Sequence, residues 1–311
     1  MTGLVVRNTG SWYVVQTDDG QLLDCKVKGN FRLKGIRSTN PVAVGDRVRI
    51  IPGADGITAL IGEILPRTNY IIRRASNLSK QSHIIAANVD LAVLLVTISH
   101  PETSTTFIDR FLASAEAYRV PVLLIFNKVD LYNDAELATL DSLCRLYQQL
   151  EYDCLSCSAT QGTGISEVRH ALQGRVSLLS GNSGVGKSTL LNALLPDAEA
   201  RTAEISAAHD TGMHTTTFSQ MYFLPEGGSI IDTPGIKGFG TFDMEREEVA
   251  HYFRELFREG SACRFGNCTH THEPGCAVLQ ALQEGRIAQS RYQSYLSMLD
   301  DHDEDRYRRD S

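Results

Sequence analysis

Gly181-Asn182-Ser183-Gly184-Val185-Gly186-Lys187-Ser188-Thr189 is the stretch that decides the fold of this chain. It matches the pattern G-x-x-x-x-G-K-[ST]. The apolar run at 176–180 predicts a short buried strand before it, and the run at 190–195 predicts a helix after it. In such a loop, backbone N–H groups and the helix end attract phosphate. We therefore predict that residues 181–189 bind a nucleoside triphosphate, with Lys187 on the β- and γ-phosphates and Ser188 on Mg²⁺. The alternative, a chance glycine-rich turn, does not account for the flanking strand and helix.

The sequence around this loop alternates between buried strands and helices from about residue 84. Expected strands lie at 89–97, 122–126, 154–158 and 176–179, and expected helices at 107–118, 135–150 and 164–172. Two further runs, 218–224 and 228–232, predict a hairpin. Helices are expected again at 245–258, 277–284 and 288–299, followed by a frayed tail from residue 300. The alternation is typical of a doubly wound α/β sheet.

Two short motifs predict recognition of guanine. Asn127-Lys128-Val129-Asp130 follows an expected strand and has the form N-K-x-D. The Asp130 carboxylate would accept from N1–H and the 2-amino group, while Asn127 would brace the loop and Lys128 would lie across the ring. Ser158-Ala159 follows the next strand, where a backbone N–H would donate to the guanine O6. On its own N-K-x-D could be a surface turn, but beside a phosphate loop it indicates a GTP site.

A third motif predicts the γ-phosphate and Mg²⁺ contacts. In Asp232-Thr233-Pro234-Gly235, Asp232 would hold Mg²⁺ through water, and the Gly235 N–H would meet the γ-phosphate. One residue among 215–217, all threonines, would complete the Mg²⁺ shell. Spacing alone leaves open which one, and Thr216 is the first choice.

The order of the motifs is unusual. The loops at 127–130 and 158–159 precede the phosphate loop, whereas they follow it in Ras-like GTPases. Because a site needs its loops together in space and not in sequence, the same sheet can form from a permuted chain. We therefore predict a circularly permuted GTPase domain.

The N-terminal region predicts a small basic barrel. Five short β-type runs in residues 3–65 fit an OB-type fold, whose open face often binds nucleic acid. Residues 1–80 carry 12 Lys/Arg against 6 Asp/Glu, a balance of +6, while the remainder has 18 against 31, or −13. A basic region on an acidic protein suggests contact with a polyanion, although charge alone fits a solvated surface equally well. The candidate RNA contacts form one basic stretch: Lys26, Lys28, Arg32, Lys34 and Arg37.

A cysteine and histidine cluster near the end of the chain predicts a structural zinc site. It reads Cys263-x4-Cys268-x-His270-x5-Cys276. Three thiolates and one imidazole fill a tetrahedral Zn²⁺ shell, which leaves no open position for catalysis. His272 is a competing ligand. A redox-active thiol pair is disfavoured for this cluster, because none of its cysteine spacings is C-x-x-C.

Together these features resemble the RsgA (YjeQ/YloQ) family of bacterial GTPases, which assist late maturation of the small ribosomal subunit. The resemblance rests on the permuted order, the barrel-like start, the terminal zinc cluster and the stretch Gly212-Met213-His214-Thr215-Thr216-Thr217. It departs from many relatives at Met213, where arginine is expected. It implies an OB domain on ribosomal RNA at 1–66, a basic linker at 67–83, a permuted GTPase domain at 84–240 and a helical zinc-binding domain at 241–311.

The catalytic prediction centres on His214. Ras-like enzymes orient the attacking water with a glutamine just after D-x-x-G, but Ile236 stands here and cannot do so. His214 lies in a polar segment without periodicity and could orient or accept a proton from water. With Lys187 and Thr216 it forms the expected catalytic set. A histidine that only packs is the alternative. We expect slow intrinsic turnover that the ribosomal subunit accelerates.

The predicted function is therefore Mg²⁺-dependent hydrolysis of GTP to GDP on the small ribosomal subunit. Two alternatives stay open: a permuted GTPase of the large subunit, and an RNA-binding module whose nucleotide site is only a switch. No apolar run approaches the ~20 residues of a membrane span, and residues 1–8 lack the apolar stretch of a signal peptide. We expect a cytoplasmic monomer.

Overall fold

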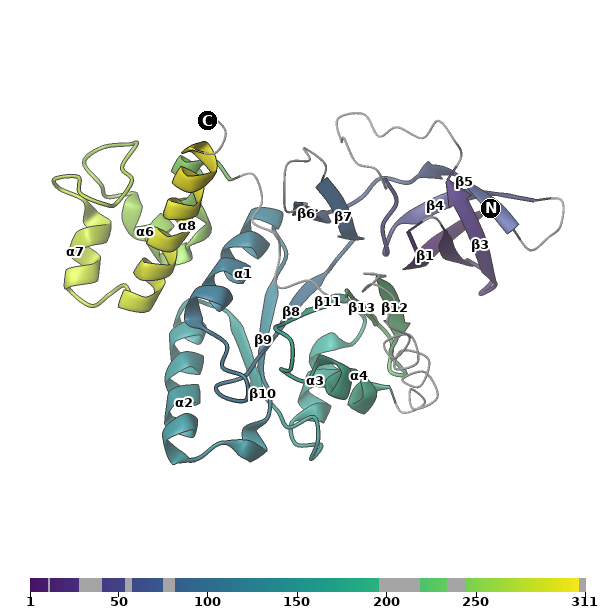
Figure 1. The fold of residues 1–311 in the computed structure, drawn as a ribbon, viewed down its shortest axis with the longest axis horizontal. Coiled ribbons are helices and arrows are strands. Elements are labelled where there is room, and N and C mark those ends of the chain that lie inside the picture. The colour runs from purple at the N-terminus through teal and green to yellow at the C-terminus, as the bar shows by residue number, and fades with distance from the viewer. Residues whose placement is uncertain are drawn as a thin grey trace.

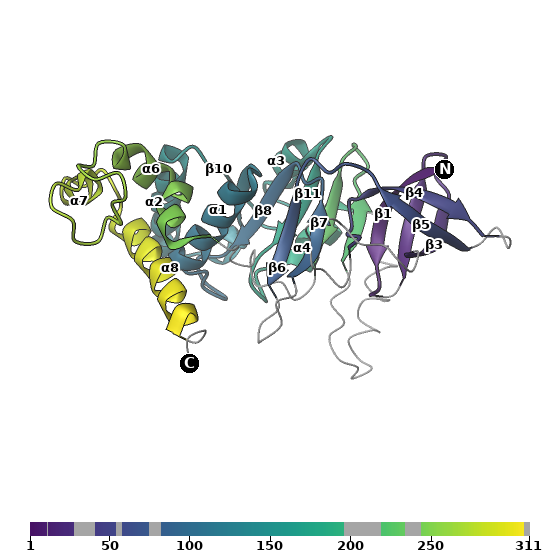
Figure 2. The same ribbon diagram turned by 90° about the horizontal axis from the view of Figure 1, so that it is seen from above.

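The computed structural model describes residues 1–10, 12–27, 41–53, 58–74, 82–195, 219–233 and 244–307. Three parts follow one another along its long axis: a β-barrel, a central α/β unit and a group of helices (Figure 1). The view from above shows the same order, with the N-terminus at the barrel end (Figure 2). Within the described part of the chain, we find no helix that is long and apolar enough to cross a bilayer.

The barrel confirms the predicted OB-type start. Its strands pair in the order β1-β2-β3-β5-β4, and a further pairing of β1 with β4 closes it. Alternate residues such as Val5, Val15 and Ile61 are fully buried, because successive strand residues point to opposite faces. The strands are β1 (Thr2–Asn8), β2 (Tyr13–Thr17), β3 (Leu22–Val27), β4 (Arg47–Pro52) and β5 (Thr58–Ile64).

The central sheet has the strand order β10-β9-β8-β11-β13-β12. Its strands are parallel except β12, which forms the predicted hairpin with β13. The strands are β8 (Leu91–Val96), β9 (Val122–Phe126), β10 (Asp153–Ser156), β11 (Val176–Ser180), β12 (Gln220–Phe223) and β13 (Ser229–Asp232). The helices between them are α1 (Thr105–Tyr118), α2 (Asp134–Gln149), α3 (Ile165–Leu172) and α4 (Lys187–Leu194).

Helices cover both faces of this sheet. Strand β8 is buried at every residue, as its unbroken apolar sequence predicts. Figure 1 shows α1 and α2 on one side of the sheet and α3 and α4 on the other. Leu94 packs in the buried cluster that includes residues of α1 and α2, and Leu95 packs in the cluster that includes residues of α3 and α4. Because β9, β10, β11 and β13 run parallel, the loops after them meet at one edge of the sheet.

The barrel is joined to the central sheet by backbone and side-chain contacts. Strand β1 pairs with β12, and the Asn8 N–H donates to the Ser219 carbonyl at 3.1 Å. A second sheet, β6 (Tyr70–Arg74) with β7 (Ser82–Ala87), lies in the stretch expected as a linker. A buried ion pair between Arg67 and Asp46, at 2.6 Å, fixes the start of that stretch to the barrel.

The C-terminal helices differ from the prediction at two places. A single helix was expected at 245–258, but the 3-10 helix η2 (Arg246–Tyr252) and the helix α6 (Arg254–Gly260) meet at Phe253. Phe253 is extended there (φ −106°, ψ 105°), and its fully buried ring packs edge-on against Tyr295. The expected frayed tail from Asp300 was also wrong, since α8 (Gln289–Tyr307) continues through a stretch without Gly or Pro. The remaining helix is α7 (Ala277–Gln283).

A buried charge cluster joins these helices to α1. Arg291 on α8 is 1% exposed and pairs with Asp109 of α1 at 2.8 Å and Glu255 of α6 at 2.6 Å. Ser294 and Tyr147 donate further hydrogen bonds to the Asp109 carboxylate. One guanidinium is thus shared by two buried carboxylates, and the added hydrogen bonds to Asp109 help to offset the cost of burying these charges.

Candidate nucleotide site and metal centre

The phosphate loop follows β11 and ends at the first turn of α4, as predicted. Gly181, Gly184 and Gly186 all have positive φ, of 149°, 83° and 100°. A Cβ at Gly186 would lie 2.5 Å from the Asn127 Nδ2, and one at Gly181 would lie 2.7 Å from the Leu95 carbonyl oxygen. Glycine is therefore required both by the backbone conformation and by the close approach of neighbouring groups.

Lys187 and Asp232 carry the opposite charges of the site. The Lys187 ammonium donates to the carbonyls of Gly181 and Asn182 at 2.7 and 2.8 Å. Burial lowers the pKa of Lys187 and raises the pKa of Asp232, and the attraction between the two groups opposes both shifts. Partly desolvated charges of this kind are common at functional sites. Asp232 is the last residue of β13, and Lys187 is the first residue of α4, after the loop that follows the neighbouring strand β11.

Asn127 connects the phosphate loop to the two predicted base-reading loops. Its side chain is 2% exposed, and its Nδ2 donates to the Val185 carbonyl at 2.9 Å. Its Oδ1 accepts from the Ala159 N–H at 3.0 Å. One amide thus links three loops that are separated in the sequence by 58 and 32 residues.

Lys128 and Asp130 lie on the same loop. The Lys128 ammonium donates to the Gly184 carbonyl at 2.7 Å and to the His100 carbonyl. The Asp130 side chain is exposed, in the 3-10 helix η1 (Val129–Leu131). The Ser158 N–H donates to the Thr163 carbonyl at 2.9 Å, which shapes the second base loop.

The structure thus brings one set of predicted residues together at the edge of the sheet. These residues are Asn127, Lys128, Asp130, Ser158, Ala159, the stretch 181–189 and Asp232. Several predicted residues lie outside the described part of the chain: Gly235, His214, Thr216 and, among the predicted RNA contacts, Lys28, Arg32, Lys34 and Arg37. Lys26 is described; it lies on β3, with its ammonium 4.2 Å from the centre of the Trp12 ring.

Sequence reasoning missed Tyr132, which supports the base-reading loop. Its hydroxyl donates to the Asn127 carbonyl at 2.5 Å and accepts from the Ile98 N–H at 2.9 Å. No motif includes Tyr132, and the contact with Ile98 spans 34 residues, so no local pattern could reveal it.

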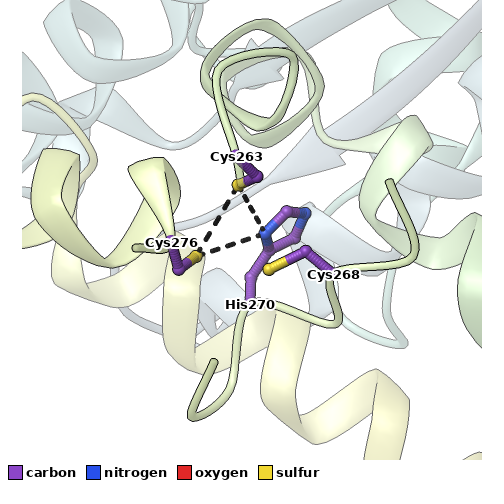
Figure 3. Close-up of side chains that lie close together, drawn as sticks. All are labelled: Cys263, Cys268, His270 and Cys276. Atoms are coloured by element: carbon purple, nitrogen blue, oxygen red, sulfur yellow. Dashed lines mark hydrogen bonds between the residues drawn. The ribbon is translucent and has the colours of Figure 1, made fainter. Parts of the chain in front are cut away.

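The predicted zinc ligands lie together in the C-terminal part (Figure 3). The ligand atoms of Cys263, Cys268, His270 and Cys276 all lie within 4.8 Å of one another. The His270 Nδ1 is 3.6 and 3.4 Å from the sulfurs of Cys263 and Cys276, which are 3.8 Å apart. Zn–S bonds of about 2.3 Å in a tetrahedron require sulfurs roughly 3.8 Å apart. The four side chains therefore fit a tetrahedral metal ion.

The surrounding structure holds these ligands in place. The N–H groups of Ala277 and Leu279, at the start of α7, donate to the sulfurs of Cys263 and Cys276. The Tyr292 hydroxyl donates to the His270 carbonyl at 2.7 Å. His272 does not join the cluster; its Nδ1 lies 2.8 Å from the Thr271 hydroxyl.

Comparisons with known proteins agree with this architecture. The family model described as "RsgA GTPase" matches residues 64–242, and "RsgA N-terminal domain" matches residues 2–59. A protein of Bacteroides fragilis named "Small ribosomal subunit biogenesis GTPase RsgA" is 66% identical over 99% of both chains. A protein of the same name from Christiangramia forsetii is 50% identical, covering 100% of this chain and 99% of its own.

Two solved structures share the fold over nearly the whole chain. YjeQ from Thermotoga maritima is 35% identical, with a TM-score of 0.76, and the match covers 96% of this chain and 97% of that one. YloQ, described as a circularly permuted GTPase, is 28% identical, with a TM-score of 0.72 and coverage of 96% and 94%. The two family models and the relatives that match over nearly the whole length show that this chain belongs to the RsgA family of GTPases.

Proposed function

We propose that this chain binds the small ribosomal subunit and hydrolyses GTP there during late maturation of the subunit. The observation that carries the proposal is the Asn127 amide, which joins the phosphate loop to both base-reading loops despite their permuted order. The name of the Bacteroides fragilis relative, which matches end to end, supports the choice of the small subunit.

We assign the nucleotide contacts from the positions of the loops. Asp130 would accept from the guanine N1–H and 2-amino group, and the Ala159 N–H would donate to O6. The stretch 181–189 would cradle the phosphates, with Lys187 on the β- and γ-oxygens. Mg²⁺, held by Ser188 and Thr216 and through water by Asp232, would neutralise charge on the same oxygens. The Gly235 N–H would meet the γ-phosphate.

For hydrolysis we assign His214 the role of orienting the attacking water. Phosphoryl transfer depends on positioning and charge stabilisation, so a residue placed only when a partner is bound gives a slow enzyme that the partner accelerates. We propose that the small subunit is this partner.

The other two parts would serve attachment and stability. We propose that the Cys3His cluster holds one structural Zn²⁺ per chain, since its closed ligand set leaves no open position. We propose that the barrel binds ribosomal RNA through Lys26, Lys28, Arg32, Lys34 and Arg37, because phosphate contacts supply affinity without reading sequence. Such a protein would act in the cytoplasm as a monomer.

The deciding experiment measures multiple-turnover GTP hydrolysis alone, with small subunits and with large subunits. We expect slow turnover alone and acceleration by small subunits only. His214→Ala should keep GTP binding and lose most of the acceleration, and Lys187→Ala should lose hydrolysis in every condition. Acceleration by large subunits would favour that subunit as the target. Binding of RNA and GTP without turnover in any condition would indicate a switch module.

A further inference from the structure

Tyr132 lies at the junction of two loops that approach the nucleotide site from different strands. Its hydroxyl donates to the Asn127 carbonyl at 2.5 Å, directly after β9. The same oxygen accepts from the Ile98 N–H at 2.9 Å, just after β8. The side chain is only 9% exposed. The hydroxyl thus uses one donor and one acceptor to hold two neighbouring backbone segments together.

The segment after β8, residues 97–103, is built to hold its shape, and we call it the brace loop. The Thr97 N–H donates to the Thr103 hydroxyl at 3.2 Å, and the Thr97 hydroxyl donates to the Pro101 carbonyl at 2.5 Å. The Thr103 N–H in turn donates a hydrogen bond to the Thr97 carbonyl at 2.9 Å. Thr97 and Thr103 are both buried, so these bonds are shielded from water.

The brace loop also reaches the phosphate loop. The His100 carbonyl accepts from the Lys128 ammonium, which donates at the same time to the Gly184 carbonyl. A Cβ at Gly184 would lie 3.3 Å from the Pro101 ring, so the two loops are already in close contact. The brace loop therefore contacts both sides of the site: the base-reading loop through Tyr132 and Lys128, and the phosphate loop through Pro101 and Lys128.

Breaking the Tyr132 contact would act on base recognition in particular. Asn127 has its side chain committed to Val185 and Ala159, so its backbone position decides how the loop carrying Asp130 meets the base. Burial raises the pKa of the Tyr132 hydroxyl, which keeps its proton available for the Asn127 carbonyl. Tyr132 itself lies two residues beyond Asp130 and belongs to none of the predicted contacts with nucleotide.

We infer that Tyr132 is a positioning residue that, with the brace loop, sets the placement of Asp130 and so the selectivity for guanine. The inference rests on the proposed GTP site and deepens it. Asp130 would contact both N1–H and the 2-amino group only if its loop is correctly placed. Hypoxanthine lacks the 2-amino group, so discrimination between guanine and hypoxanthine reports on this placement.

The test compares the affinities of Tyr132→Phe and of the unaltered chain for GDP and IDP, measured by competition against a fluorescent GDP analogue. Removing the hydroxyl leaves the Asn127 carbonyl and the Ile98 N–H without this partner. We expect GDP affinity to fall about tenfold, the scale of one buried hydrogen bond, while IDP affinity changes less. The ratio of GDP to IDP affinity should therefore shrink. Thr103→Val removes the hydroxyl that accepts from the Thr97 N–H at the other end of the brace loop. This variant should also lower the ratio of GDP to IDP affinity.

Tyr152→Phe is the matched control. Tyr152 is 2% exposed, and its hydroxyl donates to the Glu116 carboxylate at 3.0 Å, away from the loops of the site. This variant should lose thermal stability without changing the ratio. If Tyr132→Phe lowers the thermal midpoint but leaves the ratio as it was, Tyr132 is only structural and the inference fails. If the unaltered chain itself does not prefer GDP to IDP and ADP, the proposed GTP site fails instead.

Discussion

At the scale of single residues, the site depends on groups whose hydrogen bonds are already made within the protein. The Asn127 amide bonds to Val185, Ala159 and the Cys157 thiol, and the Lys128 ammonium bonds to Gly184 and His100. Asp130 differs, because its carboxylate is exposed at the start of a short helical turn. It is therefore the group on this loop that is free to meet a base.

Asp130→Asn should exchange the preferred base. An amide in place of the carboxylate offers a donor to the xanthine 2-oxygen and no longer accepts both guanine hydrogens. We expect GTP affinity to fall by ~10² or more, and affinity for xanthosine triphosphate to rise. Titration with both nucleotides measures the exchange, with Asp134→Asn, in the first turn of α2, as the control. Unchanged GTP affinity in Asp130→Asn would remove the base-reading role.

The residues of the phosphate loop, the base-reading loop and the zinc cluster could be predicted because each group forms a short pattern. The glycines of a phosphate loop and the cysteines of a metal site are recognised from their spacing within a few consecutive residues. Tyr132 and Arg291 could not be predicted in this way. Their partners Ile98 and Asp109 are 34 and 182 residues distant in the sequence, and only the packed fold brings them together.

At the scale of elements, contacts between residues far apart in the sequence also explain why one predicted helix boundary was wrong. Strands β8 and β9 follow unbroken apolar runs, and the positions of all six strands of the central sheet were predicted to within a few residues. The break between η2 and α6 at Phe253 has no breaker residue, because it results from packing of the ring against Tyr295 and Arg291. The helix propensities of neighbouring residues cannot predict a break that depends on residues 38 or more positions away in the sequence.

The ion cluster between α1, α6 and α8 should be essential for stability. Arg291→Leu would leave Asp109 and Glu255 buried without their cation, a change that costs roughly 3–5 kcal/mol. Arg286→Leu is the control, since this side chain and its partners Glu259 and Glu284 are partly exposed, and solvent screens such surface pairs so that they contribute little. Thermal unfolding followed by circular dichroism compares the two. A similar loss in both variants would show that the buried cluster contributes no more than a surface pair.

The metal centre should decide whether the segment around α6 and α7 folds. Structural Zn²⁺ supplies roughly 10–16 kcal/mol of apparent binding free energy in small finger peptides. We expect about one Zn²⁺ per chain by metal analysis, and Cys268→Ser should lose it and speed amide hydrogen exchange in residues 254–283. Cys144→Ser, on α2 and outside the cluster, should retain the metal. Chain purified without chelator that contains no metal would contradict the assignment.

At the scale of the whole molecule, the barrel and the central sheet are more closely joined than a linker between domains implies. Val6 and Val44 of the barrel region belong to the same buried cluster as Leu94 of β8. A Cβ at Gly45 would lie 2.1 Å from the carbonyl oxygen of Ala87, the last residue of β7, which shows how closely the barrel approaches the segment that leads into β8. A chain cut at residue 66 would expose this cluster, so the RNA-binding role is best tested in the full chain.

Lys26→Gln should weaken binding to ribosomal RNA and reduce its dependence on salt. Each lost phosphate contact reduces the magnitude of the slope of log affinity against log salt concentration by roughly 0.7–0.9. Trp12 is the only tryptophan and lies beside the Lys26 ammonium, so its fluorescence reports binding at this surface directly. Arg145→Gln removes the same charge from α2 and should change neither slope nor fluorescence. An unchanged slope in Lys26→Gln would mean that Lys26 contacts no phosphate.

Strand β1 pairs with β2 along one edge, and its other edge is divided between two partners: residues 2–4 pair with β4, and Arg7 pairs with Gln220 of β12. During synthesis, the barrel strands are complete once residue 64 has been made, long before β12 exists. We therefore expect the barrel to close first around half of the β1 edge. The other half of this edge stays unpaired until β12 has been translated. Until then it is prone to wrong pairing with strands of other chains.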